Sequence, residues 1–182
     1  ERWQEIEDME DEMKRLRAYV NEHLWDERTA FLYDRYGDGM LCTTKGIGAF
    51  WALQADALDK ERLDRMVAHL SDTTEFDRPH RVPSLSADHP KYNPLGRYWQ
   101  GGVWPGTNYM TIDGLYRKGY HDLAREIAAN HYAAVFEVWK NTGTFWEYYA
   151  PEKIEPGFMA RKDFVGWTGL PPIAVFIEYI LG

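Results

Sequence analysis

The chain has 182 residues, with 29 acidic and 21 basic side chains and a formal net charge of −8. Because 45% of its residues are hydrophobic and 15% aromatic, it is not a disordered chain, and we expect residues 1–182 to form a single domain with its own core. The acidic balance argues against a nucleic-acid partner, because such binding needs a positive surface.

The composition also indicates the cellular compartment in which we expect the protein. The chain has one cysteine, Cys42, which cannot form an internal disulfide. No apolar run reaches the roughly 18 residues of a membrane span, and no signal peptide is visible, so we expect no membrane partner and a cytoplasmic location. The first residue is Glu1 rather than Met. We therefore expect the chain to be a portion of something longer.

Hydrophobic periodicity predicts six helices. In the first, residues 4–25, apolar side chains recur at steps of three and four. A turn or short hairpin is expected at 31–39. Asp59 suits a helix N-cap, and Gly119 suits a left-handed C-cap. The other five helices are expected at 46–57, 59–70, 107–118, 121–140 and 168–181.

Two long segments without periodicity separate these helices. Residues 73–98 contain four prolines, which favour an ordered loop over a helix, and residues 141–165 form a second loop. Loops of this length inside a compact domain are usually functional. The sequence therefore predicts a mainly α-helical chain with its chemistry on loops.

These loops and the adjoining helix starts are dense in Trp and Tyr beside Glu, Asp, Asn, Gln and Arg, above all in 96–108, 144–152 and 163–168. Such a mixture suits a sugar, since aromatic rings stack on its apolar faces and polar groups hold its hydroxyls. For any single Trp, a role in core packing is as good an interpretation.

Glu147 lies between Phe145-Trp146 and Tyr148-Tyr149. Burial among aromatic rings can adjust a carboxyl pKa as acid–base catalysis requires. A structural ion pair with Arg161 is an equally good interpretation. No metal or cofactor is expected, because the six histidines lack metal-binding spacing and 34–45 lacks the final Glu of a calcium loop.

Three stretches resemble the C-terminal half of the catalytic domain of glycoside hydrolase family 63. They are Tyr-Trp-Gln-Gly-Gly-Val-Trp-Pro-Gly-Thr-Asn-Tyr-Met (98–110), Trp-Glu-Tyr-Tyr-Ala-Pro-Glu (146–152) and Asp-Phe-Val-Gly-Trp-Thr-Gly-Leu (163–170). The resemblance implies an all-α (α/α)6 barrel, of which this chain is about half. It also implies an inverting enzyme that cleaves a small α-glycoside, with Glu147 as general base. The sugar pocket would then be lined by Trp99, Gln100, Trp104, Asn108, Trp146, Arg161 and Trp167.

The general acid of such enzymes is an Asp in an upstream motif, which this chain lacks. We therefore expect that acid, and the other half of the barrel, to come from the same polypeptide, a companion chain or self-association. Three alternatives remain open. The chain could be a non-catalytic carbohydrate-binding or scaffold fragment, or a trehalase-like enzyme related to family 37. A sugar epimerase ranks last, because its site would need paired histidines and the six here are scattered in sequence.

Overall fold

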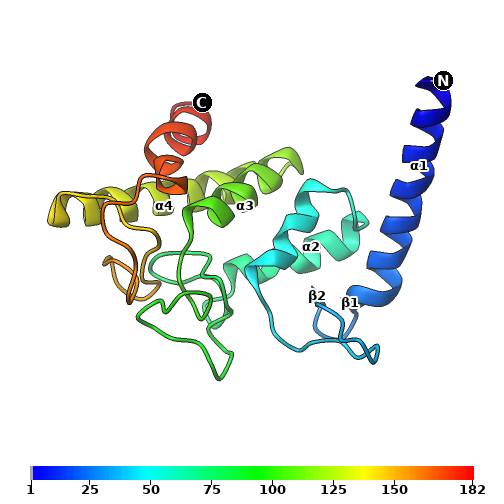
Figure 1. Cartoon of the computed structure of the whole chain (residues 1–182), viewed down its shortest axis with the longest axis horizontal. Coiled ribbons are helices and arrows are strands. Elements are labelled where there is room, and N and C mark those ends of the chain that lie inside the picture. Colours follow the sequence, from blue (N-terminus) through cyan, green and yellow to red (C-terminus); the bar gives the residue numbers. More distant parts are fainter. Residues whose placement is uncertain (1) are drawn as a thin grey trace.

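The computed structural model describes residues 2–182 and is mainly helical, as the periodicity predicts (Figure 1). Two short strands, β1 and β2, pair antiparallel, with Trp25 opposite Leu32. Within residues 2–182, no helix is long and apolar enough to cross a membrane. The elements in chain order are α1 (Arg2–Tyr19), a π-helical turn (Val20–Leu24), β1 (Trp25–Asp26), β2 (Phe31–Leu32), a 3₁₀ helix (Ile47–Gln54), α2 (Lys60–Ala68), a 3₁₀ turn (His69–Ser71), α3 (Pro105–Arg117), α4 (His121–Thr142), a 3₁₀ turn (Trp167–Gly169) and a C-terminal π-helix (Pro171–Leu181).

All six predicted helical segments are present, but two differ in type. The segment expected as a helix at 46–57 is a 3₁₀ helix, and glycines at 46 and 48 lower the α-helical propensity of its start. The last segment is a π-helix that begins at Pro171-Pro172.

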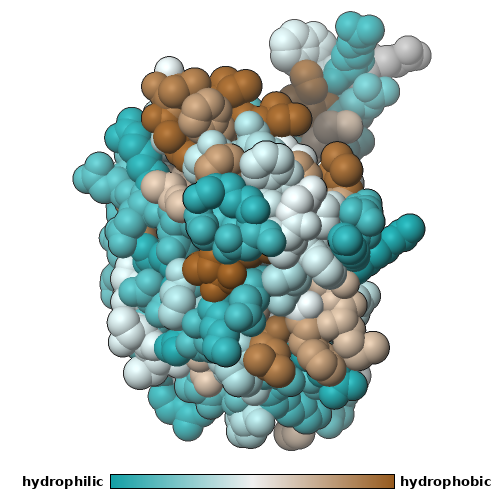
Figure 2. All heavy atoms as spheres, turned by 90° about the vertical axis from the view of Figure 1, so that its left-hand side faces the viewer, coloured by the Kyte–Doolittle hydropathy of each residue, from teal (hydrophilic) through white to brown (hydrophobic). Residues whose placement is uncertain are grey.

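Helix α1 stands apart from the rest of the chain (Figure 1). It has no buried residue, and apart from its continuation at Val20–Leu24 it contacts the chain through an ion pair near its end, between Arg17 and Asp56 at 3.9 Å. The apolar face that the sequence predicts is therefore exposed, and Trp3 is 80% accessible. A second exposed apolar surface lies over the C-terminal helix, at the top of Figure 2, and includes Ile173, Ile177 and Leu181.

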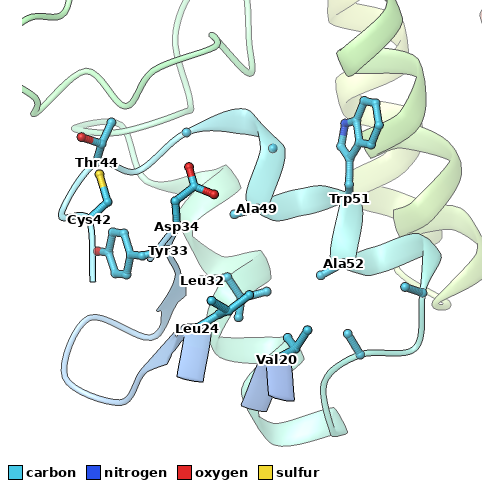
Figure 3. A pocket seen from close by; sticks show the side chains of 14 residues that line it. Val20, Leu24, Leu32, Tyr33, Asp34, Cys42, Thr44, Ala49, Trp51 and Ala52 are labelled. Carbon is cyan, nitrogen blue, oxygen red and sulfur yellow. The ribbon is translucent and has the colours of Figure 1, made fainter. Parts of the chain in front are cut away.

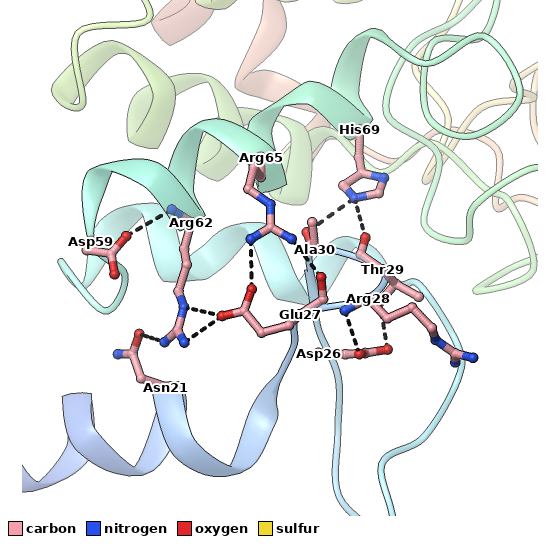
Figure 4. Close-up of polar contacts among 10 residues, drawn as sticks. All are labelled: Asn21, Asp26, Glu27, Arg28, Thr29, Ala30, Asp59, Arg62, Arg65 and His69. Carbon is pink, nitrogen blue, oxygen red and sulfur yellow. Dashed lines mark hydrogen bonds and ion pairs between the residues drawn. The ribbon is translucent and has the colours of Figure 1, made fainter.

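Helix α2 is tied to the β1–β2 hairpin by polar contacts (Figure 4). Asp59 caps α2 as predicted, because its side chain accepts a hydrogen bond from Arg62 N–H at 2.9 Å. Arg65 and Arg62 both donate to the Glu27 carboxylate. These hydrogen bonds lower the pKa of Glu27 to about 2, and the bond from Arg65 has the largest effect. His69, just after α2, lies 3.0 Å from the carbonyl oxygen of Thr29.

The main core joins α2, α3 and α4 to the hairpin and the 3₁₀ helix. Three rings at its centre, Phe31, Phe50 and Phe76, contact one another with centroids 5.2 to 6.1 Å apart. Helices α3 and α4 are antiparallel neighbours, and the turn between them contains Gly119 at φ 85°, the predicted left-handed position. The C-terminal helix packs on α4.

The two long loops are ordered, and backbone hydrogen bonds join them to each other and to the start of α3. Val103 and Tyr149 exchange both of their backbone bonds, at 2.9 and 3.0 Å. Phe158 N–H, in the second loop, donates to the carbonyl of Leu95, in the first, at 2.8 Å. The loops lie together on one side of α3 and α4, in the lower left of Figure 1, so residues far apart in sequence share one surface there.

Candidate functional site

A cavity of about 430 Å³ lies where the start of α3 meets both loops. The backbone positions the walls of the cavity. Trp104 is the N-cap residue of α3 and has an extended backbone, and the helix begins at Pro105, which occupies its first position. The lining residues are Trp51, Tyr98, Trp99, Trp104, Gly106, Thr107, Tyr109, Met110, Glu147, Trp167 and Leu170.

Trp104 is the centre of an aromatic cluster on this wall. Its ring stacks on Trp99 at 4.5 Å between centroids and contacts Tyr148 at 4.4 Å and Trp167 at 5.8 Å. Trp104 itself is buried, whereas Trp99 is 48% and Trp167 39% exposed. Their free surface is suited to stacking against the apolar face of a sugar ring.

Glu147 is held at the cavity by its main chain. Its N–H donates to the carbonyl of Arg161 at 3.0 Å, and its own carbonyl accepts a 2.7 Å bond from the indole N–H of Trp167. Glu147 and Arg161 are thus joined through the backbone, and within residues 2–182 Glu147 forms no ion pair. Among the lining residues, Glu147 carries the one carboxylate.

A charged clamp, Arg78–Glu152–Tyr92, fixes the loop that carries Glu147. Both oxygens of Glu152 accept from the Arg78 guanidinium, at 2.7 and 2.8 Å, and the Tyr92 hydroxyl donates to one of them at 2.6 Å. The Arg78 hydrogen bonds hold the pKa of Glu152 below its usual range. Because Glu152 lies five residues after Glu147, the clamp joins the two loops beside the cavity.

Four of the predicted sugar-binding residues lie outside the cavity lining. Gln100 and Arg161 are exposed. Asn108 is fully buried and donates to the carbonyl of Val82 at 3.1 Å, while the Trp146 indole donates to Thr142 at 3.0 Å. Glu147, Trp99, Trp104 and Trp167 are the predicted residues that the fold brings together.

The cavity also contains residues that the sequence analysis did not single out. Tyr98 and Thr107 lie inside the 98–110 stretch, so their neighbours already pointed to them. Trp51 belongs to an apolar helical segment with no polar residue next to it, and nothing in the sequence distinguishes it from a core residue.

The structure corrects one expectation about the histidines. His80 and His131 are paired, with Nε2 of the first 2.8 Å from Nδ1 of the second, and both are fully buried. Sequence could not reveal this pair, because 51 positions separate the two residues. Neither ring lines the cavity, so the pair does not favour an epimerase. Within residues 2–182, no three His, Cys, Asp or Glu side chains cluster as a metal site requires.

Comparison with known proteins decides the family. The model of the mannosylglycerate hydrolase MGH1-like glycoside hydrolase domain matches residues 3–164. The chain belongs to this glycoside hydrolase family. Among relatives, a probable mannosyl-oligosaccharide glucosidase of Schizosaccharomyces pombe is 30% identical over 88% of the chain and 22% of its own length. A mannosylglycerate hydrolase of Rubrobacter radiotolerans is 29% identical over 87% of the chain and 35% of its own length.

Solved structures agree with this membership of family 63. The mannosylglycerate hydrolase of Thermus thermophilus, in complex with glucose, superposes with a TM-score of 0.67 at 26% identity, covering 86% of this chain and 37% of that protein. Neutral trehalase of Saccharomyces cerevisiae gives a TM-score of 0.73 at 17% identity, over 90% of this chain and 29% of the trehalase, and supports the fold alone. The expected (α/α)6-barrel class is confirmed, and the chain spans about a third of the length of these relatives.

Proposed function

We propose that this chain forms the general-base side of the active site of an inverting glycoside hydrolase. The observation that carries the proposal is the position of Glu147, the one carboxylate of a cavity walled by Trp99, Trp104 and Trp167. The sugar stacks on the indoles, and Glu147 removes a proton from a water molecule as the water oxygen attacks the anomeric carbon. A second carboxyl group, an Asp outside this chain, protonates the departing glycosidic oxygen.

The relatives suggest the class of substrate. Their names are those of a mannosylglycerate hydrolase and a probable mannosyl-oligosaccharide glucosidase, so we propose a small α-linked glucoside or mannoside. The exposed surfaces of Trp99 and Trp167 suit either sugar, because stacking depends on the apolar face of the sugar ring.

The test is Glu147→Gln in the assembled enzyme. Loss of a general base lowers the rate by roughly 10²–10⁴ while the ground-state binding of sugar is kept. Glu155→Gln is the matched control, because Glu155 is in the same loop and outside the cavity lining. Near-full activity of Glu147→Gln would exclude this residue as the base. Proton NMR of the first product formed checks the stereochemistry, since inversion of an α-glycoside yields the β-anomer.

We also infer that catalysis needs the remaining half of the barrel. Two observations support this: the exposed apolar face of α1, and a length of about a third of the relatives. Exposed apolar surface of this extent marks a contact site. Light scattering with intact mass should find a companion polypeptide, an oligomer or a longer chain. A lone 21.3 kDa monomer that hydrolyses α-glycosides would contradict this inference. Sugar binding without turnover by the assembled protein would instead favour a non-catalytic carbohydrate-binding role.

A further inference from the structure

The two peptide groups that flank Glu147 are held by hydrogen bonds from residues 161–168. The carbonyl of Trp146 accepts a 2.8 Å bond from the Thr168 hydroxyl. In the same peptide group, the N–H of Glu147 donates to the carbonyl of Arg161 at 3.0 Å. The next peptide group is fixed through the carbonyl of Glu147, which accepts the 2.7 Å bond from the Trp167 indole. Because each peptide group is planar, fixing both sets the backbone angles at Glu147 and the direction in which its side chain leaves the main chain.

Thr168 is the side-chain anchor that does not face the substrate. It is fully buried and does not line the cavity that Glu147 lines, whereas the nearby Trp167 and Leu170 do. The 3₁₀ turn that carries Thr168 leads into the C-terminal helix, which packs on α4. Within residues 2–182, the Thr168 hydroxyl is the one donor to the carbonyl of Trp146. Loss of this hydroxyl would therefore release the peptide group on the N-terminal side of Glu147.

Such anchoring is not general for the cavity-lining carboxylates of this chain. A second cavity, of about 490 Å³, lies beside the 3₁₀ helix, and among its lining residues Asp34 carries the one carboxylate (Figure 3). The carbonyl of Asp34 accepts a bond from the backbone N–H of Cys42 at 2.7 Å. Within residues 2–182, no side chain donates to either peptide group that flanks Asp34. The double side-chain anchor is thus a feature of Glu147.

We propose that Thr168 is a positioning residue for the general base. This inference rests on the proposed function. The Thr168 hydroxyl holds the peptide between Trp146 and Glu147, and this peptide keeps the Glu147 carboxylate directed at the attacking water. A general base acts only within hydrogen-bond reach of the proton that it removes, and a misplacement of about 1 Å can cost on the order of 10²-fold in rate. Because Thr168 does not line the cavity, its loss should lower kcat and leave KM nearly unchanged.

The test measures kcat and KM of Thr168→Val and Thr168→Ser in the assembled enzyme, with 4-nitrophenyl α-glucoside and 4-nitrophenyl α-mannoside as substrates. Valine keeps the shape of threonine without the hydroxyl, so we expect kcat to fall about tenfold or more while KM changes by less than about twofold. Thr168→Ser keeps the donor and should restore kcat close to that of the parent. Thr111→Val is the matched control. Thr111 is also fully buried, donates through its hydroxyl to a carbonyl, that of Thr107, at 3.0 Å, and lines neither cavity.

A double variant connects the effect to Glu147. In the Glu147→Gln background the base is absent, so adding Thr168→Val should lower kcat further by no more than about twofold. Thermal melting shows whether each compared variant is folded. If Thr168→Val does not fold, Thr168→Ser and Thr168→Ala give the same comparison, since both lack the methyl group and only serine keeps the hydroxyl.

The outcomes separate this inference from the proposed function. If Glu147→Gln loses activity but kcat of Thr168→Val falls no further than that of Thr111→Val, Thr168 does not position the base and this inference is overturned. A raised KM with unchanged kcat also overturns it, because Thr168 would then act on sugar binding. An equal loss of kcat with and without the Glu147 carboxylate has the same meaning. Near-full activity of Glu147→Gln, or no hydrolysis of either glycoside by the assembled parent, contradicts the proposed function itself and this inference with it.

Discussion

The buried His80–His131 pair should make the fold sensitive to mild acid. The 2.8 Å contact needs one ring to donate and the other to accept, so the accepting ring is neutral, and complete burial disfavours a charge on the donating ring. Their remaining ring nitrogens have no hydrogen-bond partner within the described residues. Burial lowers the pKa of both histidines, that of His131 to about 3.

The sign and size of the effect follow from linkage. A histidine in the unfolded chain has a pKa of about 6.5, so below that pH the unfolded state binds protons that the folded state excludes. Stability is therefore lost as pH falls from about 6.5 toward the folded pKa. Between pH 7 and pH 5, a shift of this size costs about 2 kcal/mol for His131 alone, and about twice that if His80 also stays neutral.

Urea unfolding at pH 7, 6 and 5 measures this loss. His131→Gln removes one of the two titrating rings. Between pH 7 and pH 5, the loss in free energy of unfolding should therefore be about 2 kcal/mol smaller for this variant than for the parent. His121→Gln is the control, because His121 lies exposed on the same helix, α4. Equal pH slopes for His131→Gln and the parent, or a parent stability that does not change from pH 7 to pH 5, would refute the reasoning.

Two further predictions concern the loops around the cavity. Glu152→Gln should cost about 2 kcal/mol of stability at pH 7, because it removes a charged acceptor from Arg78, and urea unfolding tests it. Because the pKa of Glu152 is lowered in the folded state, this contribution is present above the ordinary carboxyl pKa and is lost as pH falls through the pKa of the folded state. A stability difference between parent and variant that is equal at pH 7 and pH 3 would contradict this. Gly157→Ala would place a Cβ 2.3 Å from the Tyr148 ring, and should lower stability by about 1–3 kcal/mol and weaken sugar binding, since Tyr148 supports Trp104. An unchanged melting temperature for Gly157→Ala would show that the ring moves aside freely.

The sequence predicted best what depends on local pattern. The periodicity located the helices, Asp59 was recognisable as a cap, and the prolines of 73–98 marked an ordered loop. The helix types could not be predicted in full, because 3₁₀ and π geometry depends on packing as well as on Gly and Pro. The exposed face of α1 followed the predicted periodicity, but sequence alone could not show that no other part of the described chain covers it.

For the candidate site, the sequence reached the residues that share a motif and missed those that only the fold brings together. Glu147 and its surrounding Trp residues were recognisable from the 98–110, 146–152 and 163–170 stretches. Trp51 was not, because its position at the cavity depends on the contact between the 3₁₀ helix and α3. The His80–His131 contact was hidden for the same reason.

The backbone bonds around Glu147 have a consequence for sequence variation and for engineering. Because the 147 peptide is fixed by the carbonyl of residue 161, any side chain that keeps the local backbone can occupy positions 161 and 162 without moving the carboxylate. Both side chains are exposed at the edge of the loop. These two positions should therefore accept exposed substitutions, such as changes of surface charge, while the Glu147 carboxylate stays in place.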